Sequence, residues 1–227
     1  MMEWSTARRR YEVALVGILL YIVLDTVAQL LPPHYSPISQ AESDLAVGPY
    51  GYIMTLNFLN RGVLSFEFLF ALMGTVRLTG GRISQYRTGF WLLVVWSAGA
   101  LLLAAFPTDV PSTPVSWHGA IHLIVALVAF FGGGFGALAF SLRMSGEALQ
   151  KVRRFALPVG ALAVVFLLLE GFVPFLAPHL ASDFGGLLER LFLGAVLAWM
   201  LAISVYMLRN APEPFGGSVT APSPLGP

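Results

Sequence analysis

Six long apolar segments constrain the fold of this chain more than any other feature. Each has at least about 19 residues, enough for a helix to cross a hydrocarbon core of about 30 Å. Only 11% of the residues are charged, whereas a soluble domain has about 25%. The expected fold class is an all-α polytopic membrane protein, a six-transmembrane-helix bundle over residues 1–209. The predicted spans are residues 11–31, 51–76, 88–106, 118–142, 153–177 and 186–208.

The first span follows three consecutive arginines at residues 8–10, a pattern that also opens secretory signal peptides. Its apolar stretch is longer than that of a usual signal peptide, and it contains Asp25. No small-x-small cleavage site comes before the proline pair at residues 32–33. We therefore expect this segment to remain as the first transmembrane helix.

The basic residues predict how the bundle is oriented. Of the 13 basic residues, all but Arg61 and Arg190 fall on the side shared by both termini and the second and fourth loops. By the positive-inside rule this side is cytoplasmic, which suggests an inner (plasma) membrane protein with both termini inside. Residues 210–227, rich in Pro, Gly and Ser, should form a disordered cytoplasmic tail. Membrane lipids are the expected partners, protein partners or a homo-oligomer are alternatives, and nucleic acid is not expected.

Arg61 lies near the middle of the second span, where a charge costs from about 3 to more than 10 kcal/mol, depending on the method. A residue in this position needs a partner, a polar cavity or a ligand. Asp25, Glu67 or Glu170 could neutralise Arg61 and hold the bundle together. Alternatively, Arg61 and Arg190 form a cationic pocket in the outer leaflet. Such a pocket suits a phosphate or carboxylate, because an arginine fork donates two parallel hydrogen bonds to these groups.

His118 and His122 open the fourth span four residues apart, so both rings lie on the same helix face. Two histidines at this spacing can ligate one divalent metal ion, the only cofactor that the sequence suggests. A third ligand would then come from one of four acidic residues, Asp44, Asp109, Asp183 or Glu189. In a second interpretation the two rings hydrogen-bond the acidic loops. In a third they bind a ligand or relay protons without a metal.

These residues predict a polar pocket in the outer leaflet that binds a lipid headgroup or a small anionic ligand. Arg61 and Arg190 would supply charge, while Asp44 and Asp109 would anchor a loop over the ligand. The residues expected to bind it are Asp44, Asn57, Arg61, Asp109, His118, His122, Glu189 and Arg190. One alternative is a metal-assisted or acid/base lipid hydrolase or transferase, and another is a structural or assembly subunit of a larger membrane complex. Whether the protein is an enzyme stays open, and no catalytic residue is assigned.

Several short motifs resemble an uncharacterised prokaryotic family of six-span membrane proteins, known as domain of unknown function 998. They are Ser-Asp-Leu at residues 43–45, residues 57–62 of the second span, Phe-Pro-Thr-Asp at 106–109, residues 118–122, and Gly-Leu-Leu-Glu-Arg at 186–190. The resemblance covers most of residues 11–208. Members of the family often have Gln before the arginine of the sixth span, where this chain has Glu189. The family is distantly similar to FRAG1/DRAM-type membrane proteins, linked to lipid and glycolipid handling, and it implies no established activity.

Overall fold

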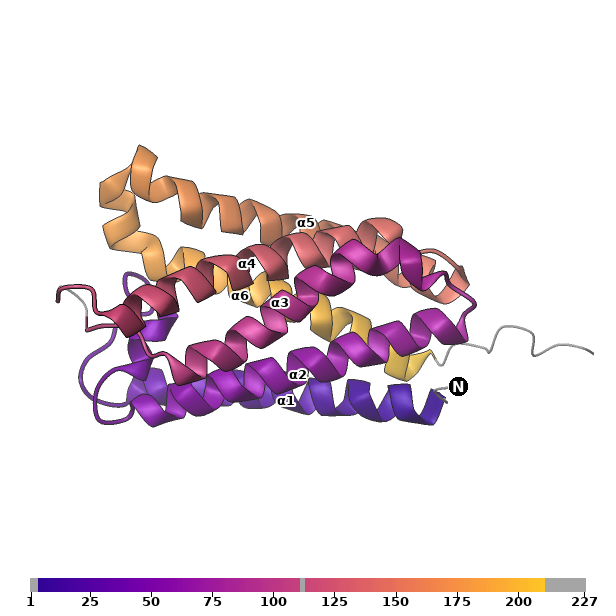
Figure 1. Cartoon of the computed structure of the whole chain (residues 1–227), viewed down its shortest axis with the longest axis horizontal. Coiled ribbons are helices and arrows are strands. Elements are labelled where there is room, and N and C mark those ends of the chain that lie inside the picture. The colour runs from indigo at the N-terminus through magenta and orange to yellow at the C-terminus, as the bar shows by residue number, and fades with distance from the viewer. Residues whose placement is uncertain (1–3, 111–112, 211–227) are drawn as a thin grey trace, which may run out of the picture.

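The described part of the protein is a bundle of six long helices (Figure 1). A computed structural model describes residues 4–110 and 113–210, and this part of the chain contains no strand. All six helices are long and apolar enough to cross a membrane, which confirms the predicted all-α membrane fold. The helices are α1 Trp4–Leu30, α2 Gly51–Leu78, α3 Arg87–Ala105, α4 Trp117–Arg143, α5 Glu147–Leu176 and α6 Pro178–Arg209, with short 3-10 helices η1 Glu42–Ala46 and η2 Ile83–Tyr86.

Each helix packs against the next one along the chain, and α1 also packs against α6. The described N-terminus and the end of α6 therefore lie at the same end of the bundle (Figure 1), which we call the terminal end. The opposite end, which we call the loop end, carries residues 31–50, 106–110 and 113–116. The contact between α1 and α6 matters for the site, because it places the loop that follows α1 beside α6.

Three helices extend well beyond the predicted spans. Helix α1 begins at Trp4, α5 at Glu147 and α6 at Pro178, so the predicted outer connection at residues 178–185 is helical instead. Hydropathy locates only the apolar part of a helix, whereas backbone hydrogen bonding continues through its polar flanks. Pro178 is compatible with this position because the first residue of a helix needs no amide hydrogen bond within the helix. The predicted tail lies outside the described residues, apart from Asn210.

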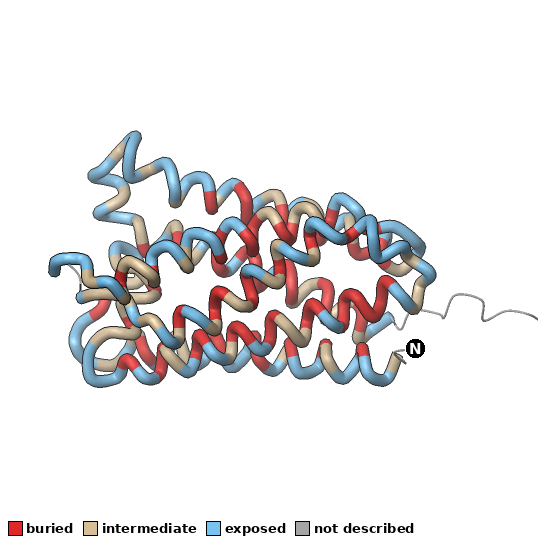
Figure 2. The backbone as a smooth tube through the Cα atoms, in the orientation of Figure 1, coloured by how far each residue is buried: buried red, intermediate tan, exposed pale blue. Residues whose placement is uncertain are grey.

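Helices α2 and α6 form the centre of the bundle. In the most apolar 18-residue stretch of each helix, 61% of the residues are buried in α2 and 56% in α6, compared with 22% in α5. Figure 2 shows buried positions concentrated along the middle of the bundle. Two buried tryptophans each donate an indole N–H to a serine on a neighbouring helix. Trp96 donates to Ser65 at 3.1 Å and Trp199 donates to Ser141 at 2.8 Å. These hydrogen bonds satisfy the only polar atom of each indole in the core.

The glycines of α4 allow this helix to pack closely on α3, as the small-xxx-small pattern of Gly132 and Gly136 predicts. A Cβ atom at Gly132 would lie 2.6 Å from the carbonyl oxygen of Leu92, and one at Gly136 would lie 3.0 Å from the Leu93 side chain. Larger residues at these positions would push the two helices apart.

Candidate polar site at the loop end

Arg190 holds the loop of residues 31–50 against α6. Its guanidinium donates to the carbonyl oxygens of Pro37 and Gln40 at 3.1 and 3.2 Å, and to the hydroxyl of Tyr35 at 2.6 Å. The Tyr35 ring also lies 5.3 Å from the guanidinium carbon. Most of the Arg190 donors are thus directed at this loop, and the role of Arg190 in binding a ligand stays a prediction.

The backbone contact between the loop and α6 is equally close. The amide of Leu187 donates to the carbonyl oxygen of Ile38 at 2.8 Å. A Cβ atom at Gly186 would lie only 2.1 Å from the carbonyl oxygen of Gln40, so no larger residue fits there without moving the loop. Together with the Arg190 hydrogen bonds, these contacts fasten the loop over the end of the bundle.

Three carboxyl groups from different elements gather beneath this loop. Glu42 comes from η1, and its side chain accepts a hydrogen bond from the hydroxyl of Tyr21 on α1. The Glu42 amide donates to Oε2 of Glu189 on α6 at 2.8 Å. Asp25 on α1 lies 4.0 Å from Nη2 of Arg190. The loop, α1 and α6 thus meet in one network of charged and hydrogen-bonded side chains.

Glu42 is the most perturbed of the acidic groups outside the spanning helices. Burial raises its pKa to about 8, and the nearby charges of Asp25 and Glu189 act in the same direction. The charge of Arg61 and the hydrogen bond from Tyr21 oppose this rise of the pKa. At neutral pH the Glu42 carboxyl is therefore mainly protonated, which removes one negative charge from the cluster.

Arg61 lies in the core of the bundle and forms no ion pair with any of the described residues. It is 1% exposed, and ten residues of helix, about 15 Å, separate it from the start of α2. Its guanidinium carbon lies 4.9 Å from the centroid of the Trp96 ring and 5.3 Å from that of Phe58. Such cation–π contacts contribute about 2 kcal/mol when the charge is desolvated. They offset only part of the cost of a buried charge.

None of the three carboxylates named as candidates to neutralise Arg61 contacts it in the described part of the chain. Asp25 faces Arg190 at 4.0 Å, Glu67 pairs with Arg10 at 3.0 Å, and Glu170 has no hydrogen-bond partner for its buried Oε2 among the described residues. In the case of Glu67 the reason is helical geometry. It lies six residues after Arg61 on α2 and therefore on another face of the helix.

Arg61 and Asn57 both carry buried polar atoms that have no hydrogen-bond partner in the described part of the chain. These atoms are Nε and Nη2 of Arg61 and Oδ1 of Asn57. The two arginine N–H groups lie along the same edge of the guanidinium and form its two-pronged donor. Asn57 lies one turn earlier on the same face and uses its amide nitrogen to donate to the carbonyl oxygen of Tyr21 at 3.2 Å. Unpaired buried groups of this kind are rare in native proteins and call for a partner.

Asp109 and His118 form a separate polar group at the start of α4. Asp109 accepts hydrogen bonds from the amide and hydroxyl of Ser116 at 2.8 and 2.6 Å, which lower the pKa of its carboxyl. Ser116 caps α4 by accepting from the amide of Gly119 at 3.1 Å. Nδ1 of His118 lies 3.7 Å from Oδ1 of Asp109. Asp109 therefore anchors its own loop to α4.

His122 lies deeper, and its ring takes a different partner from that of His118. Its Nδ1 lies 2.7 Å from the carbonyl oxygen of Phe106, and because a carbonyl only accepts, Nδ1 carries a proton. Phe58 contacts both the His122 ring, at 6.2 Å between centroids, and Arg61. Across residues 4–110 and 113–210, no three His, Cys, Asp or Glu side chains are grouped to hold a metal ion. Of the two rings, that of His122 makes the hydrogen bond to Phe106, whereas Nδ1 of His118 has no hydrogen-bond partner among the described residues. The three interpretations of the histidine pair stay predictions.

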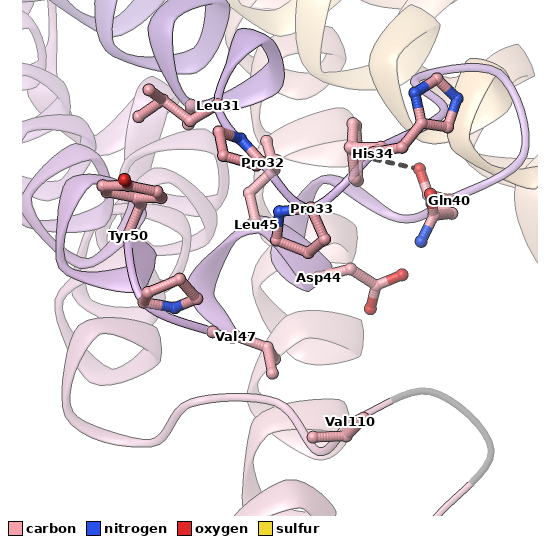
Figure 3. A pocket seen from close by; sticks show the side chains of 14 residues that line it. Leu31, Pro32, Pro33, His34, Gln40, Asp44, Leu45, Val47, Tyr50 and Val110 are labelled. Carbon is pink, nitrogen blue, oxygen red and sulfur yellow. Dashed lines mark hydrogen bonds between the residues drawn. The ribbon is translucent and has the colours of Figure 1, made fainter.

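Asp44 lines a cavity of about 190 Å³ within the loop end. Figure 3 shows this cavity between the chain at residues 31–35, η1 and Val110 of the connection before α4. Asp44 is half-buried there, and burial raises the pKa of its carboxyl. Asp44 thus lies among the loop residues, whereas Glu42, two residues earlier, reaches the polar network.

Five of the predicted site residues fall into two groups around Arg61, while Asn57 lies one turn from Arg61 and Asp44 lines the loop cavity. One contains Glu189 and Arg190 with the loop, and the other contains Asp109, His118 and His122. Sequence reasoning missed Tyr21, Tyr35 and Glu42 as members of the network. Two features of the sequence could have indicated two of them. Tyr21 lies one turn before Asp25 on the same helix face, and Glu42 is a carboxylate in a loop that has no Lys or Arg.

Comparison with known families agrees with the predicted resemblance. The family described as Protein of unknown function (DUF998) matches residues 15–206. No curated protein and no solved structure matches the chain. The prokaryotic origin and the distant similarity to FRAG1/DRAM-type proteins stay predictions. Because the match covers most of the chain, the protein belongs to this family, and its six apolar helices indicate a multi-pass integral membrane protein of unknown function.

Proposed function

We propose that the protein binds an oxyanion, a carboxylate or phosphate, at Arg61 within the loop end of the bundle. The observation that carries the proposal is the buried donor edge of Arg61, whose Nε and Nη2 have no hydrogen-bond partner among the described residues. Two parallel N–H donors match two oxygens of a carboxylate or phosphate. Binding such a group would neutralise a charge that is otherwise costly at this depth.

The charges around Arg61 are compatible with an anionic ligand. Asp25 faces Arg190, and the pKa of about 8 keeps Glu42 mainly neutral. Glu189 uses one carboxyl oxygen to accept from the Glu42 amide. Arg61 is thus left without a carboxylate within 4.0 Å in the described chain, and Phe58 and Trp96 line its sides.

The oxyanion could belong to a lipid headgroup or to a small soluble anion, and the two sources can be distinguished. The full chain would be reconstituted in nanodiscs of phosphatidylcholine alone, and binding of inorganic phosphate and of a dicarboxylate would be measured by calorimetry. A second set of nanodiscs would contain phosphatidylglycerol, followed by mass spectrometry of the retained lipid. A lipid ligand predicts selective retention of phosphatidylglycerol, and a small anion predicts saturable binding in phosphatidylcholine alone.

The variant Arg61→Lys tests the donor edge, because lysine keeps the charge and loses the fork. We expect it to weaken binding at least tenfold, while the matched control Arg77→Lys, at an exposed position of the same helix, leaves it unchanged. If Arg61→Lys and Arg61→Gln both bind as the wild type does and only unfold more easily, Arg61 is architectural and the proposal fails. The hydrolase and assembly-subunit alternatives stay predictions.

We also propose that the terminal end faces the cytoplasm and that the protein resides in the plasma (inner) membrane. The distribution of the basic residues supports this orientation. The chain contains no cysteine, so single cysteines at exposed Ser39 and Ser84 can report on each side. A membrane-impermeant maleimide added to intact cells should label Ser39→Cys and spare Ser84→Cys. The opposite labelling pattern would invert the proposed orientation.

A further inference from the structure

A second candidate site lies on the flank of the bundle, between α4 and α5. Here a groove of about 430 Å³ is lined by apolar residues of both helices and by one charged residue, Glu170. Several of the lining side chains, among them Leu127, Phe131 and Phe172, are more than 40% exposed. In a membrane-spanning bundle such side chains face lipid, so the groove is reached sideways from the bilayer.

Glu170 has no cationic partner in the described part of the protein. Its Oε2 is buried without a hydrogen bond, and no Arg, Lys or His nitrogen lies within ion-pairing distance. The neighbouring charged group is another carboxyl, that of Glu189 on α6. An acidic side chain within a span is rare and costly unless something compensates its charge. The surroundings of Glu170 therefore favour a positively charged ligand and disfavour an anion.

Aromatic rings supply the second part of the recognition chemistry. Phe130, Phe131 and Phe172 all line the groove that contains Glu170. The face of an aromatic ring attracts a cation, most strongly when water is excluded. A carboxylate combined with several phenylalanine rings is suited to a protonated amine, and the remaining aliphatic lining is suited to an alkyl chain.

We propose that the α4–α5 groove binds an amphipathic amine, with its ammonium group at Glu170 and its alkyl chain along the apolar lining. The ligand would enter from the lipid phase. This site is independent of the proposed oxyanion site, because it lies on other helices and selects the opposite charge.

The test uses the full chain in phosphatidylcholine nanodiscs and dodecylamine as the probe. Binding is measured by calorimetry, and empty nanodiscs are used to subtract partitioning of the probe into lipid. We expect saturable binding that falls at least tenfold in Glu170→Gln. Glu147→Gln, at an exposed position of the same helix, is the matched control and should bind as the wild type does. Dodecanol, which has the same chain and no charge, should show no saturable binding.

A second variant tests the groove without touching the carboxyl group. A side chain at Gly171 meets nothing within 4 Å of its Cβ, so Gly171→Leu fills the groove while the fold is retained. It should abolish dodecylamine binding, and Arg77→Lys, at an exposed position of α2, should leave that binding intact. The proposal is overturned if Glu170→Gln binds dodecylamine as tightly as the wild type, if dodecanol binds equally well, or if Gly171→Leu has no effect.

Discussion

Replacing Arg190 with alanine should release the loop of residues 31–50 from α6. The guanidinium donates to two loop carbonyls and to the Tyr35 hydroxyl, and its side chain is only 18% exposed. A hydrogen bond that involves a charged group contributes about 1.5–3 kcal/mol. Three such bonds would suggest a larger total, but water can replace part of them once the side chain is removed. We therefore expect the free energy of loop opening to fall by about 3 kcal/mol.

Hydrogen–deuterium exchange measures this opening directly. The amides of Gln40 and Glu42 are hydrogen-bonded inside the loop and to Glu189 respectively, so they exchange only when the loop opens. A loss of about 3 kcal/mol corresponds to exchange roughly 100-fold faster. Amides in the middle of α2 should keep their wild-type rates, because the change is local.

Two variants distinguish the loss of the Arg190 hydrogen bonds to the loop from a general loss of positive charge. Arg190→Lys keeps the charge but has no planar fork, so its exchange rates should lie between those of the wild type and Arg190→Ala. Arg209→Ala removes an exposed arginine from the end of the same helix and should change nothing in the loop. Equal exchange at Gln40 and Glu42 in the wild type and in Arg190→Ala would show that other contacts hold the loop, and our reasoning would be refuted.

Three further changes test the packing and the charges. Gly186→Ala should lower the free energy of unfolding by about 1–3 kcal/mol, because the added methyl group overpacks against the loop. In the control Gly194→Ala the added Cβ meets no atom within 4 Å, so the free energy of unfolding should stay equal or rise. Thermal unfolding in detergent measures both. Ser141→Ala should cost about 1–3 kcal/mol in the same assay, because the buried indole N–H of Trp199 loses its acceptor. In the folded state the pKa of Glu42 is about 8, above its ordinary value of 4.5. Between these two pH values the folded state keeps a proton that the unfolded state has lost. The free energy of unfolding should therefore fall as the pH rises from about 4.5 to about 8. Glu42→Gln should flatten that slope in unfolding midpoints measured across this range, and an unchanged slope would contradict the assignment.

The sequence predicted the number and type of helices well, because crossing a bilayer requires a length and a hydropathy that single segments carry. It also predicted the close packing at Gly132 and Gly136, since small residues four apart lie on one helix face. Helices α1, α5 and α6 begin before the predicted spans. Hydropathy does not register the polar turns of a helix outside the hydrocarbon core.

The candidate site was only partly predictable. The sequence singled out Arg61, Glu189 and Arg190 because they are charged residues in or at the ends of apolar spans. A charged side chain there is costly unless another group compensates it. It could not assign their partners, because these come from elements far apart in the chain. Glu42 meets Glu189 across 147 positions, and Glu67 meets Arg10 across 57.

The sequence by itself determined that the described part of this chain forms six helices long and apolar enough to cross a membrane, with acidic loops at one end and most of the basic residues at the other. Both properties follow from local composition, which needs no knowledge of neighbours in space. The tertiary structure alone decided that Arg190 holds a loop against α6 while Arg61 forms no ion pair within the described part of the chain. Pairing depends on the rotation and depth of each helix relative to the others, and those are set by side-chain packing across the whole bundle.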